Sequence, residues 1–186
     1  MRKQLLLHLA LALLAPPAFS QENHISNLEV VPRLATDDIA SVKVALMMPG
    51  IYLSAPMRES DLFRSQCVFT SHNSEKIHSI INILENFIEL PARSRVENVE
   101  LRNAIYLNKK DGSQVKFLMS DSVEKNIVNG TMYSNSYATP FLGSGLLLKN
   151  LRGWAKHDVE LAGGRPKDYC DVVRNYTYSK SDAFQY

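Results

Sequence analysis

The sequence predicts one α+β domain, in which an antiparallel sheet of about five or six strands carries two principal helices. Three observations support this prediction. A helical apolar stripe runs through residues 74–90, alternating patterns typical of hairpins occupy residues 99–133, and no repeat, linker or low-complexity tract divides the chain. The length of 186 residues is also that of a single domain.

The first twenty residues have the pattern of a targeting signal. Arg2 and Lys3 form a short positive region, and an apolar run of about 11 residues follows at 5–15. Ala18 and Ser20 are small residues at the positions that signal peptidase recognises. A membrane-spanning helix needs about 20 apolar residues, so this run is too short to be one. We therefore expect a cleaved signal peptide at 1–20, a mature chain at 21–186 without a membrane anchor, and a periplasmic location.

Charge and cysteine content narrow the class of protein further. Cleavage removes Arg2 and Lys3, which leaves 19 Lys+Arg against 19 Asp+Glu. A neutral chain with interspersed charges lacks the basic stripe that nucleic acid requires, so no nucleic-acid partner is expected. The chain has two cysteines, Cys67 and Cys170. In an oxidising compartment this even count predicts a disulfide, which would pin the C-terminal segment to the body.

The N-terminal third contains several strand candidates. Residues 41–48 are an apolar run that ends at the turn signal Pro49-Gly50. Residues 62–70 are a second candidate and carry Cys67. Residues 28–34, interrupted by Pro32, suit an edge strand or a lead-in.

The clearest single element is a helix over about 74–90. Asn73 or Ser74 is placed to cap its start, and Pro91 to stop it. Apolar side chains recur at three- and four-residue steps and make one buried stripe: Ile77, Ile80, Ile81, Leu84, Phe87 and Ile88.

Two hairpins are predicted after this helix. Residues 99–107 and 115–119 alternate apolar and polar side chains around a turn at 109–112. A shorter hairpin is predicted at 126–133, with Asn129-Gly130 as its tight turn.

The C-terminal half is predicted to contain the second principal helix. Thr139-Pro140 looks like a helix start, but Gly143 and Gly145 weaken the opening turns, so Ser144 is the alternative start. The helix is expected to run to about His157. Residues 163–166 are interpreted as a loop. Residues 175–186 are polar and rich in Tyr, and they form either a final strand or a loose end.

No catalytic or metal-binding pattern emerges from the chain. The histidines of the mature part, His24, His72, His78 and His157, show no metal-ligand spacing, and neither a metal nor a cofactor is expected. Ser144 lies between two glycines, but Leu142 stands where a nucleophile elbow needs a glycine. A nucleophilic Cys67 with His72 as its base would be abolished by the disulfide.

The remaining functional signal is a surface rich in Tyr and Arg. These residue types are enriched where protein surfaces meet, because they offer large contact area together with a polar tip. The expected partner-binding residues are Tyr133, Tyr137, Arg152, Arg165, Tyr169, Arg174 and Tyr176.

These observations lead to one hypothesis and two rivals. The hypothesis is an exported binding or inhibitor protein of the immunity type, which occludes the active site of a secreted toxin or cell-envelope-degrading enzyme. The general organisation resembles that of small periplasmic inhibitor and immunity proteins. The first rival is a small-molecule or cell-envelope ligand binder, with a pocket between the helix at 74–90 and the sheet. The second is an enzyme whose site is assembled from scattered residues such as His72, His157 and Asp158.

Overall fold

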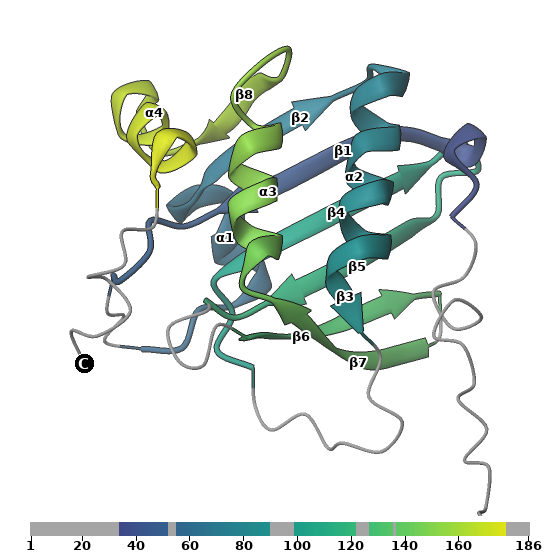
Figure 1. The fold of residues 1–186 in the computed structure, drawn as a ribbon, viewed down its shortest axis with the longest axis horizontal. Helices are drawn as coiled ribbons and strands as arrows, with labels where there is room; N and C mark the ends of the chain where they lie inside the picture. Colours follow the sequence, from purple (N-terminus) through teal and green to yellow (C-terminus); the bar gives the residue numbers. More distant parts are fainter. Residues whose placement is uncertain (1–33, 52–54, 90–98, 122–126, 136, 178–186) are drawn as a thin grey trace, which may run out of the picture.

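The computed structural model describes residues 34–51, 55–89, 99–121, 127–135 and 137–177 (Figure 1). These residues form one eight-stranded sheet in the order β3-β7-β6-β5-β4-β1-β2-β8, together with four α-helices. Every neighbouring pair of strands is antiparallel. The predicted α+β class is confirmed. The prediction of five or six strands and two principal helices was too low.

The elements follow one another along the chain without a domain break. In order they are a 3₁₀ turn η2 (Thr36–Asp38), β1 (Ile39–Leu46), α1 (Glu59–Ser65), β2 (Cys67–Ser71), α2 (Ser74–Phe87), β3 (Ile88–Glu89), β4 (Asn103–Lys109), β5 (Gln114–Met119), β6 (Ile127–Ser134), β7 (Tyr137–Ser144), α3 (Leu146–Trp154), β8 (Glu160–Gly164) and α4 (Lys167–Asn175).

Helix α2 forms where its apolar stripe predicts it. The Asn73 side chain caps the start by accepting hydrogen bonds from the backbone N–H groups of Glu75 and Lys76, at 2.8 and 3.3 Å. The stripe is buried against the sheet at Ile77, Ile80, Ile81 and Leu84. The helix ends at Phe87 rather than at Leu90, because Ile88 and Glu89 become extended and pair with β7.

Helices α2 and α3 lie side by side across one face of the sheet (Figure 1). The Trp154 indole N–H donates to the carbonyl of Lys76 at 2.9 Å, which ties the two helices together. Burial of one Leu or Ile side chain contributes about 1.5–3 kcal/mol, so this layer is the main source of stability. Its principal members on the strands and α3 are Val42, Val44, Leu46, Phe69, Ile105, Leu107, Phe117, Met119, Phe141, Leu147, Leu148 and Leu151.

The opposite face of the sheet is partly covered by α1. Leu62 of α1 is fully buried in a second cluster with Ala45, Ala104 and Tyr106. The cross-strand register places these three strand residues on the face opposite to Val44 and its neighbours. The predicted strand at 62–70 was therefore wrong in its first half, since those residues begin as helix α1 and become strand only at Cys67.

The predicted hairpin at 99–119 is confirmed in outline. Strands β4 and β5 pair from Asn103 opposite Met119 to Asn108 opposite Gln114. Gly112 has a φ of +83° in the turn, a conformation that favours glycine. The strand at 41–48 is confirmed too, as β1.

The predicted tight turn at Asn129-Gly130 was wrong, because both residues lie within the continuous strand β6. The turn between β6 and β7 instead contains Asn135, with a φ of 50°. Gly130 lies opposite Phe141, and a Cβ atom there would come within 2.2 Å of the Phe141 ring. The Phe141 ring therefore requires a glycine at position 130, which explains why a strand contains the Asn-Gly pair that is typical of turns.

The predicted helix start at Thr139-Pro140 was also wrong. Both residues lie in strand β7, and the helix begins only at Leu146. Among the described residues, β3 pairs with β7 at Gly143 and Leu142. At Pro140 the described sheet therefore has a neighbouring strand on one side only, a position where proline is tolerated.

Two further elements were missed near the C-terminus. Residues interpreted as a loop at Gly163 and Gly164 belong to strand β8, which pairs with β2 through a bulge. Gly164 has a φ of +87°, and a Cβ atom there would come within 1.7 Å of the Gln66 carbonyl oxygen. The following helix α4 has few apolar residues, and its apolar stripe is short, with Cys170 and Val173 buried.

The predicted disulfide is present between Cys67 on β2 and Cys170 on α4, with a Cα–Cα distance of 5.4 Å. Both cysteines are buried. A disulfide is typical of an oxidising, exported environment. No helix among the described residues is long and apolar enough to cross a membrane. Several predicted features lie outside the described residues: the signal peptide, nearly all of the strand at 28–34, the helix stop at Pro91 and most of the segment 175–186.

The close approach of Gly130 to Phe141 generates a stability prediction. Gly130→Ala should lower the free energy of unfolding by about 1–3 kcal/mol, because the new methyl group overpacks the ring. Urea denaturation measures this change. The matched control is Gly153→Ala in α3, where a Cβ atom meets no atom within 4 Å. This variant should gain about 0.5 kcal/mol from helix propensity. Equal effects of the two substitutions would contradict the packing account.

Candidate binding surface

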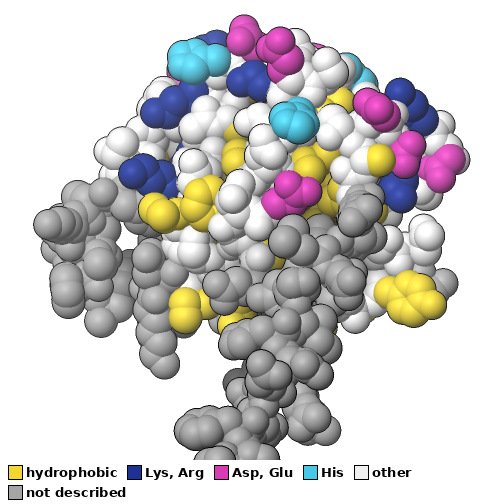
Figure 2. Space-filling model, turned by 45° about the vertical axis from the view of Figure 1, so that its right-hand side comes forward, with side chains coloured by type: hydrophobic (Ala, Val, Ile, Leu, Met, Phe, Trp, Pro, Cys, Tyr) yellow, Lys and Arg dark blue, Asp and Glu magenta, His cyan; other side chains and the backbone are white. Residues whose placement is uncertain are grey.

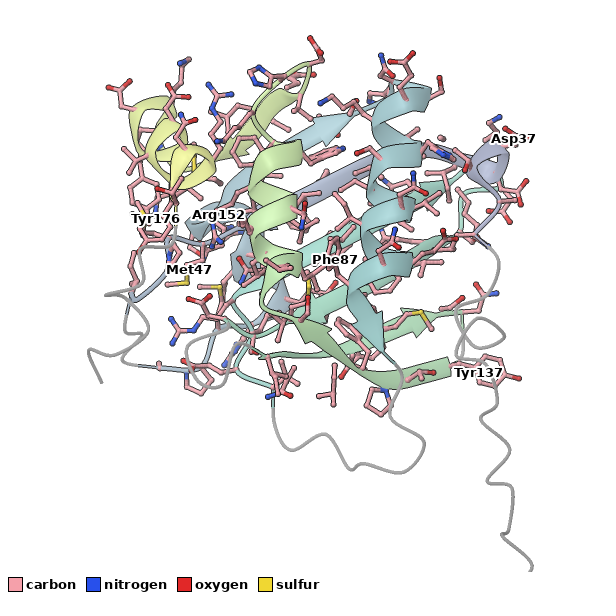
Figure 3. All side chains as sticks on the ribbon, viewed as in Figure 1. Asp37, Met47, Phe87, Tyr137, Arg152 and Tyr176 are labelled. Atoms are coloured by element: carbon pink, nitrogen blue, oxygen red, sulfur yellow. A yellow bond between two sulfur atoms is a disulfide. The ribbon has the colours of Figure 1, made fainter. Side chains whose placement is uncertain are left out.

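The seven predicted contact residues do not form one patch. Tyr133 and Tyr137 lie on β6 and β7, near the β3 edge of the sheet. The other five residues are on or near α3 and α4, toward the β8 edge. Figure 3 shows Tyr137 and Tyr176 on opposite sides of the molecule. Sequence proximity in the C-terminal half therefore does not translate into one surface.

Arg152 is an internal residue rather than a contact residue. Its side chain is 1% exposed. One guanidinium nitrogen, Nη2, donates to the Met47 carbonyl at 3.2 Å, and the guanidinium carbon lies 5.9 Å from the centre of the Tyr176 ring. Figure 3 shows these three residues gathered beside α3. Arg152 thus links α3, the end of β1 and the end of α4, and in this structure it is not available to a partner.

Helix α4 presents the most open apolar contact of the C-terminal region. Its inner face buries Cys170 and Val173, while Val172 on the outer face is 54% exposed. A shallow open groove of about 560 Å³ runs along the end of this helix. We call it the α4 groove, and its lining residues are Asp171, Val172, Asn175, Tyr176 and Thr177.

The charges at the rim of the α4 groove are paired within the helix. Asp171 accepts from Lys167 Nζ at 2.5 Å and forms an ion pair with Arg174 at 2.5 Å. The hydrogen bond from Lys167, supported by the charges of Arg174 and Lys167, lowers the pKa of Asp171 below its usual range. Because the negative charge of Asp171 is already balanced by these ion pairs, the groove offers a partner mainly apolar and uncharged polar contacts.

Two more predicted residues stand at the start of α4. Arg165 Nε donates to the Ser65 carbonyl at 3.0 Å, which caps the C-terminal end of α1. The same guanidinium lies 5.6 Å from the centre of the Tyr169 ring. Arg165 therefore has a structural task, and only the remaining surface of this pair is open to contact.

A charged cluster that sequence reasoning missed lies on the α1-covered face of the sheet. The register aligns Lys43, Tyr106, Lys116 and Tyr133 in one row across β1, β4, β5 and β6. Glu59 of α1 lies over this row and accepts from Lys116 Nζ at 2.8 Å and from the Tyr106 hydroxyl at 3.3 Å. The predicted hairpin brings the strands of Tyr106 and Lys116 together. Helix α1, which supplies Glu59, was not predicted, and so the cluster was not foreseen.

This cluster binds α1 to the sheet. The Phe63 and Tyr106 rings have centroids 5.0 Å apart, and Lys43 Nζ lies 5.0 Å above the Phe63 ring. Burial of Tyr106, and then the charge and hydrogen bond of Glu59, raise the pKa of its hydroxyl above the usual value. Both lysines have partners inside the cluster, so the row does not present a pair of uncommitted cations to a ligand.

The residues of the two rival hypotheses are also placed. His72, His157 and Asp158 are all exposed, and no hydrogen bond or ion pair joins them in the described part of the chain. Among the described residues, no group of three His, Cys, Asp or Glu side chains is arranged to hold a metal ion. The interface between α2 and the sheet, where a ligand pocket was considered, is packed with buried Ile77, Ile80 and Leu84.

Comparisons of the chain with protein-family models, with curated proteins and with solved structures find no match. In the α4 groove one predicted contact residue, Tyr176, lies beside an exposed apolar side chain, Val172.

The Glu59 cluster generates a prediction on pH dependence. The fold raises the pKa of Tyr106, so the neutral hydroxyl is favoured in the folded state. The stability that this neutral hydroxyl contributes is fully present below about pH 10, the ordinary tyrosine pKa, and decreases as the pH rises above it. Between pH 8 and pH 11 the wild type should lose about 1 kcal/mol more stability than Tyr106→Phe, measured by urea denaturation. Tyr137→Phe, which changes a 77% exposed ring, is the control and should follow the wild type. Parallel curves for wild type and Tyr106→Phe would refute this account.

Proposed function

We propose that this chain is an exported, periplasmic binding protein of the immunity type, which inhibits a secreted toxin or cell-envelope-degrading enzyme by occluding its active site. The observation that carries the proposal is the α4 groove. It presents an exposed Val172 and the Tyr176 ring on a helix that a buried disulfide fastens to the sheet.

A fastened helix is suited to high-affinity contact. Binding normally costs the conformational freedom of the groups that become ordered, and a rigid scaffold reduces this cost. Central apolar and aromatic anchors dominate the energy of such interfaces, while surrounding groups exclude water. Val172 and Tyr176 have the first role here, and Tyr169 with Arg165 the second. A stable interface buries about 800 Å² on each partner, so contact must extend beyond the groove itself.

Docking by strand addition is less favoured than docking through α4. Unpaired edge strands are the usual templates for an added strand. Edge strand β8 has five residues and contains a bulge. Gly163 and Gly164 in β8 have φ values of +150° and +87°, which interrupt the regular extended edge. The β8 edge of the described sheet, which lies beside α4, is therefore blunted.

The charge distribution favours a partner that is recognised by shape. Acidic and basic side chains both occur, in small groups, on the face shown in Figure 2. The whole sequence has 21 Lys+Arg against 19 Asp+Glu. With so small a net charge there is little electrostatic steering, and association rates of about 10⁵–10⁶ M⁻¹s⁻¹ with weak salt dependence are expected.

The test is an affinity capture in which two exposed positions are compared. Mature protein, oxidised so that Cys67 and Cys170 are joined, serves as bait for the secreted and periplasmic proteins of the same organism. We expect retention of a toxin or hydrolase near one-to-one stoichiometry, and loss of its activity when the bait is added. Val172→Asp should weaken binding by at least about tenfold, since it places a charge at the centre of the contact.

Tyr137→Asp is the matched control, because it introduces the same charge at an exposed position on the opposite side of the molecule. It should bind as the wild type does. Loss of binding by Tyr137→Asp alone would move the docking face to the β6–β7 end. Retention of no enzyme at all by the wild-type bait would overturn the proposed function.

A further inference from the structure

Helix α4 has few attachments to the rest of the fold. It has nine residues, and only Cys170 and Val173 are buried. An isolated helix of this length is unstable in water, so α4 depends on tertiary contacts. Besides the disulfide and Val173, Tyr169 packs partly buried against the core. The ends are joined to the body by hydrogen bonds from Arg165 to the carbonyls of Ser65 and Gln66 and by the contact of Arg152 with Tyr176. Single contacts of these kinds are worth about 0.5–2 kcal/mol each.

The body of the fold does not depend on the disulfide in the same way. Cys67 lies on β2, which is paired with β1 on one side and with β8 on the other. The core between the sheet, α2 and α3 contains more than twenty buried apolar side chains, of which α4 supplies Cys170 and Val173. Opening of the disulfide therefore acts mainly on α4, a nine-residue helix with two buried side chains of which one is the cysteine itself.

We infer that the Cys67–Cys170 pair is a redox switch for the α4 groove. In the oxidised chain α4 is docked and the groove exists. In the reduced chain α4 detaches, the groove is lost, and the sheet with α2 and α3 remains folded. The consequence for binding rests on the proposed function, whereas the detachment of α4 does not.

The chemistry of the switch is thiol–disulfide exchange. On oxidation the two thiols form one S–S bond and release two protons and two electrons to an oxidising disulfide, which is reduced to two thiols. In a reducing compartment the reverse exchange leaves Cys67 and Cys170 as thiols. The chain would then be unable to bind before export and able to bind after oxidation, which would confine inhibition to the compartment of a secreted enzyme.

Access to the sulfur atoms is itself controlled by α4. Cys67 is 0% and Cys170 1% exposed. A thiol reaches either sulfur only when α4 opens locally, so the rate of reduction under native conditions reports how often the helix detaches. Val173 is the other buried residue of α4, and its truncation should make opening more frequent.

Hydrogen exchange tests the switch without knowledge of the partner. Oxidised wild type is compared with wild type held in dithiothreitol and with the double variant Cys67→Ser, Cys170→Ser. Protection of the α4 amides should fall by about two orders of magnitude on reduction, while the amides of α2 stay as protected as before. If α4 keeps its protection when the disulfide is open, the inference is wrong. If α2 loses protection together with α4, the disulfide stabilises the whole fold and the inference is also wrong.

A second measurement keeps the inference testable should the double variant fail to fold. In the oxidised protein, Val173→Ala should speed reduction by dithiothreitol about tenfold, because it removes part of the buried contact that closes α4. Val172→Ala is the matched control on the exposed face and should leave the rate unchanged. Equal rates for Val173→Ala and the wild type would show that opening of α4 does not control access to the sulfurs.

The partner arm separates the switch from the proposed function. Affinity capture with oxidised bait should retain the enzyme, and capture with reduced bait should not. Equal retention by both baits would overturn the control of binding by the disulfide. Retention by neither bait would overturn the proposed function and leave the hydrogen-exchange result to decide the detachment of α4.

Discussion

The structure depends on the need to cover one apolar face of a large antiparallel sheet. Alternate residues of the strands place Val44, Ile105 and Phe117 on that face, where water has to be excluded. Helices α2 and α3 supply the cover, and the hydrogen bond from Trp154 to Lys76 holds them against each other. Once this layer is complete, little apolar surface remains to fasten any further element, and this shortage explains how α1 and α4 are attached.

Each of these two helices is held by a different kind of interaction. Helix α1 buries Leu62 and is oriented by Glu59, which accepts hydrogen bonds from Lys116 and Tyr106. Helix α4 is held by a covalent bond to β2, because it has only two buried side chains with which to pack. Because the disulfide holds α4 in place, the outer face of this helix does not need to pack against the rest of the protein. An exposed apolar residue such as Val172 is therefore tolerated there without loss of the fold.

The way α4 is attached bears directly on the proposed binding function. The α2 and α3 layer supplies most of the buried core, and the disulfide gives α4 a fixed position against it. A surface of this kind is ordered before it binds, which lowers the entropic cost of association. It is also conditional on the redox state of one cysteine pair, whereas the body is not.

The sequence by itself determined the α+β class, helix α2, strand β1, the hairpin of β4 and β5, and the cysteine pairing. These features follow from local periodicity, from a capping residue, or from the presence of two cysteines alone in the chain. Tertiary structure decided the rest. Gly130 looked like a turn residue, whereas the Phe141 ring on the neighbouring strand is what requires a glycine there. Pro140 looked like a helix start, whereas it lies in β7, paired with β6. Arg152 and Tyr137 were both predicted as contact residues. In the structure Arg152 is buried, and Tyr137 is exposed on the side of the molecule opposite to Tyr176. Neither outcome was visible locally, because burial and proximity are set by how elements distant in the chain pack together.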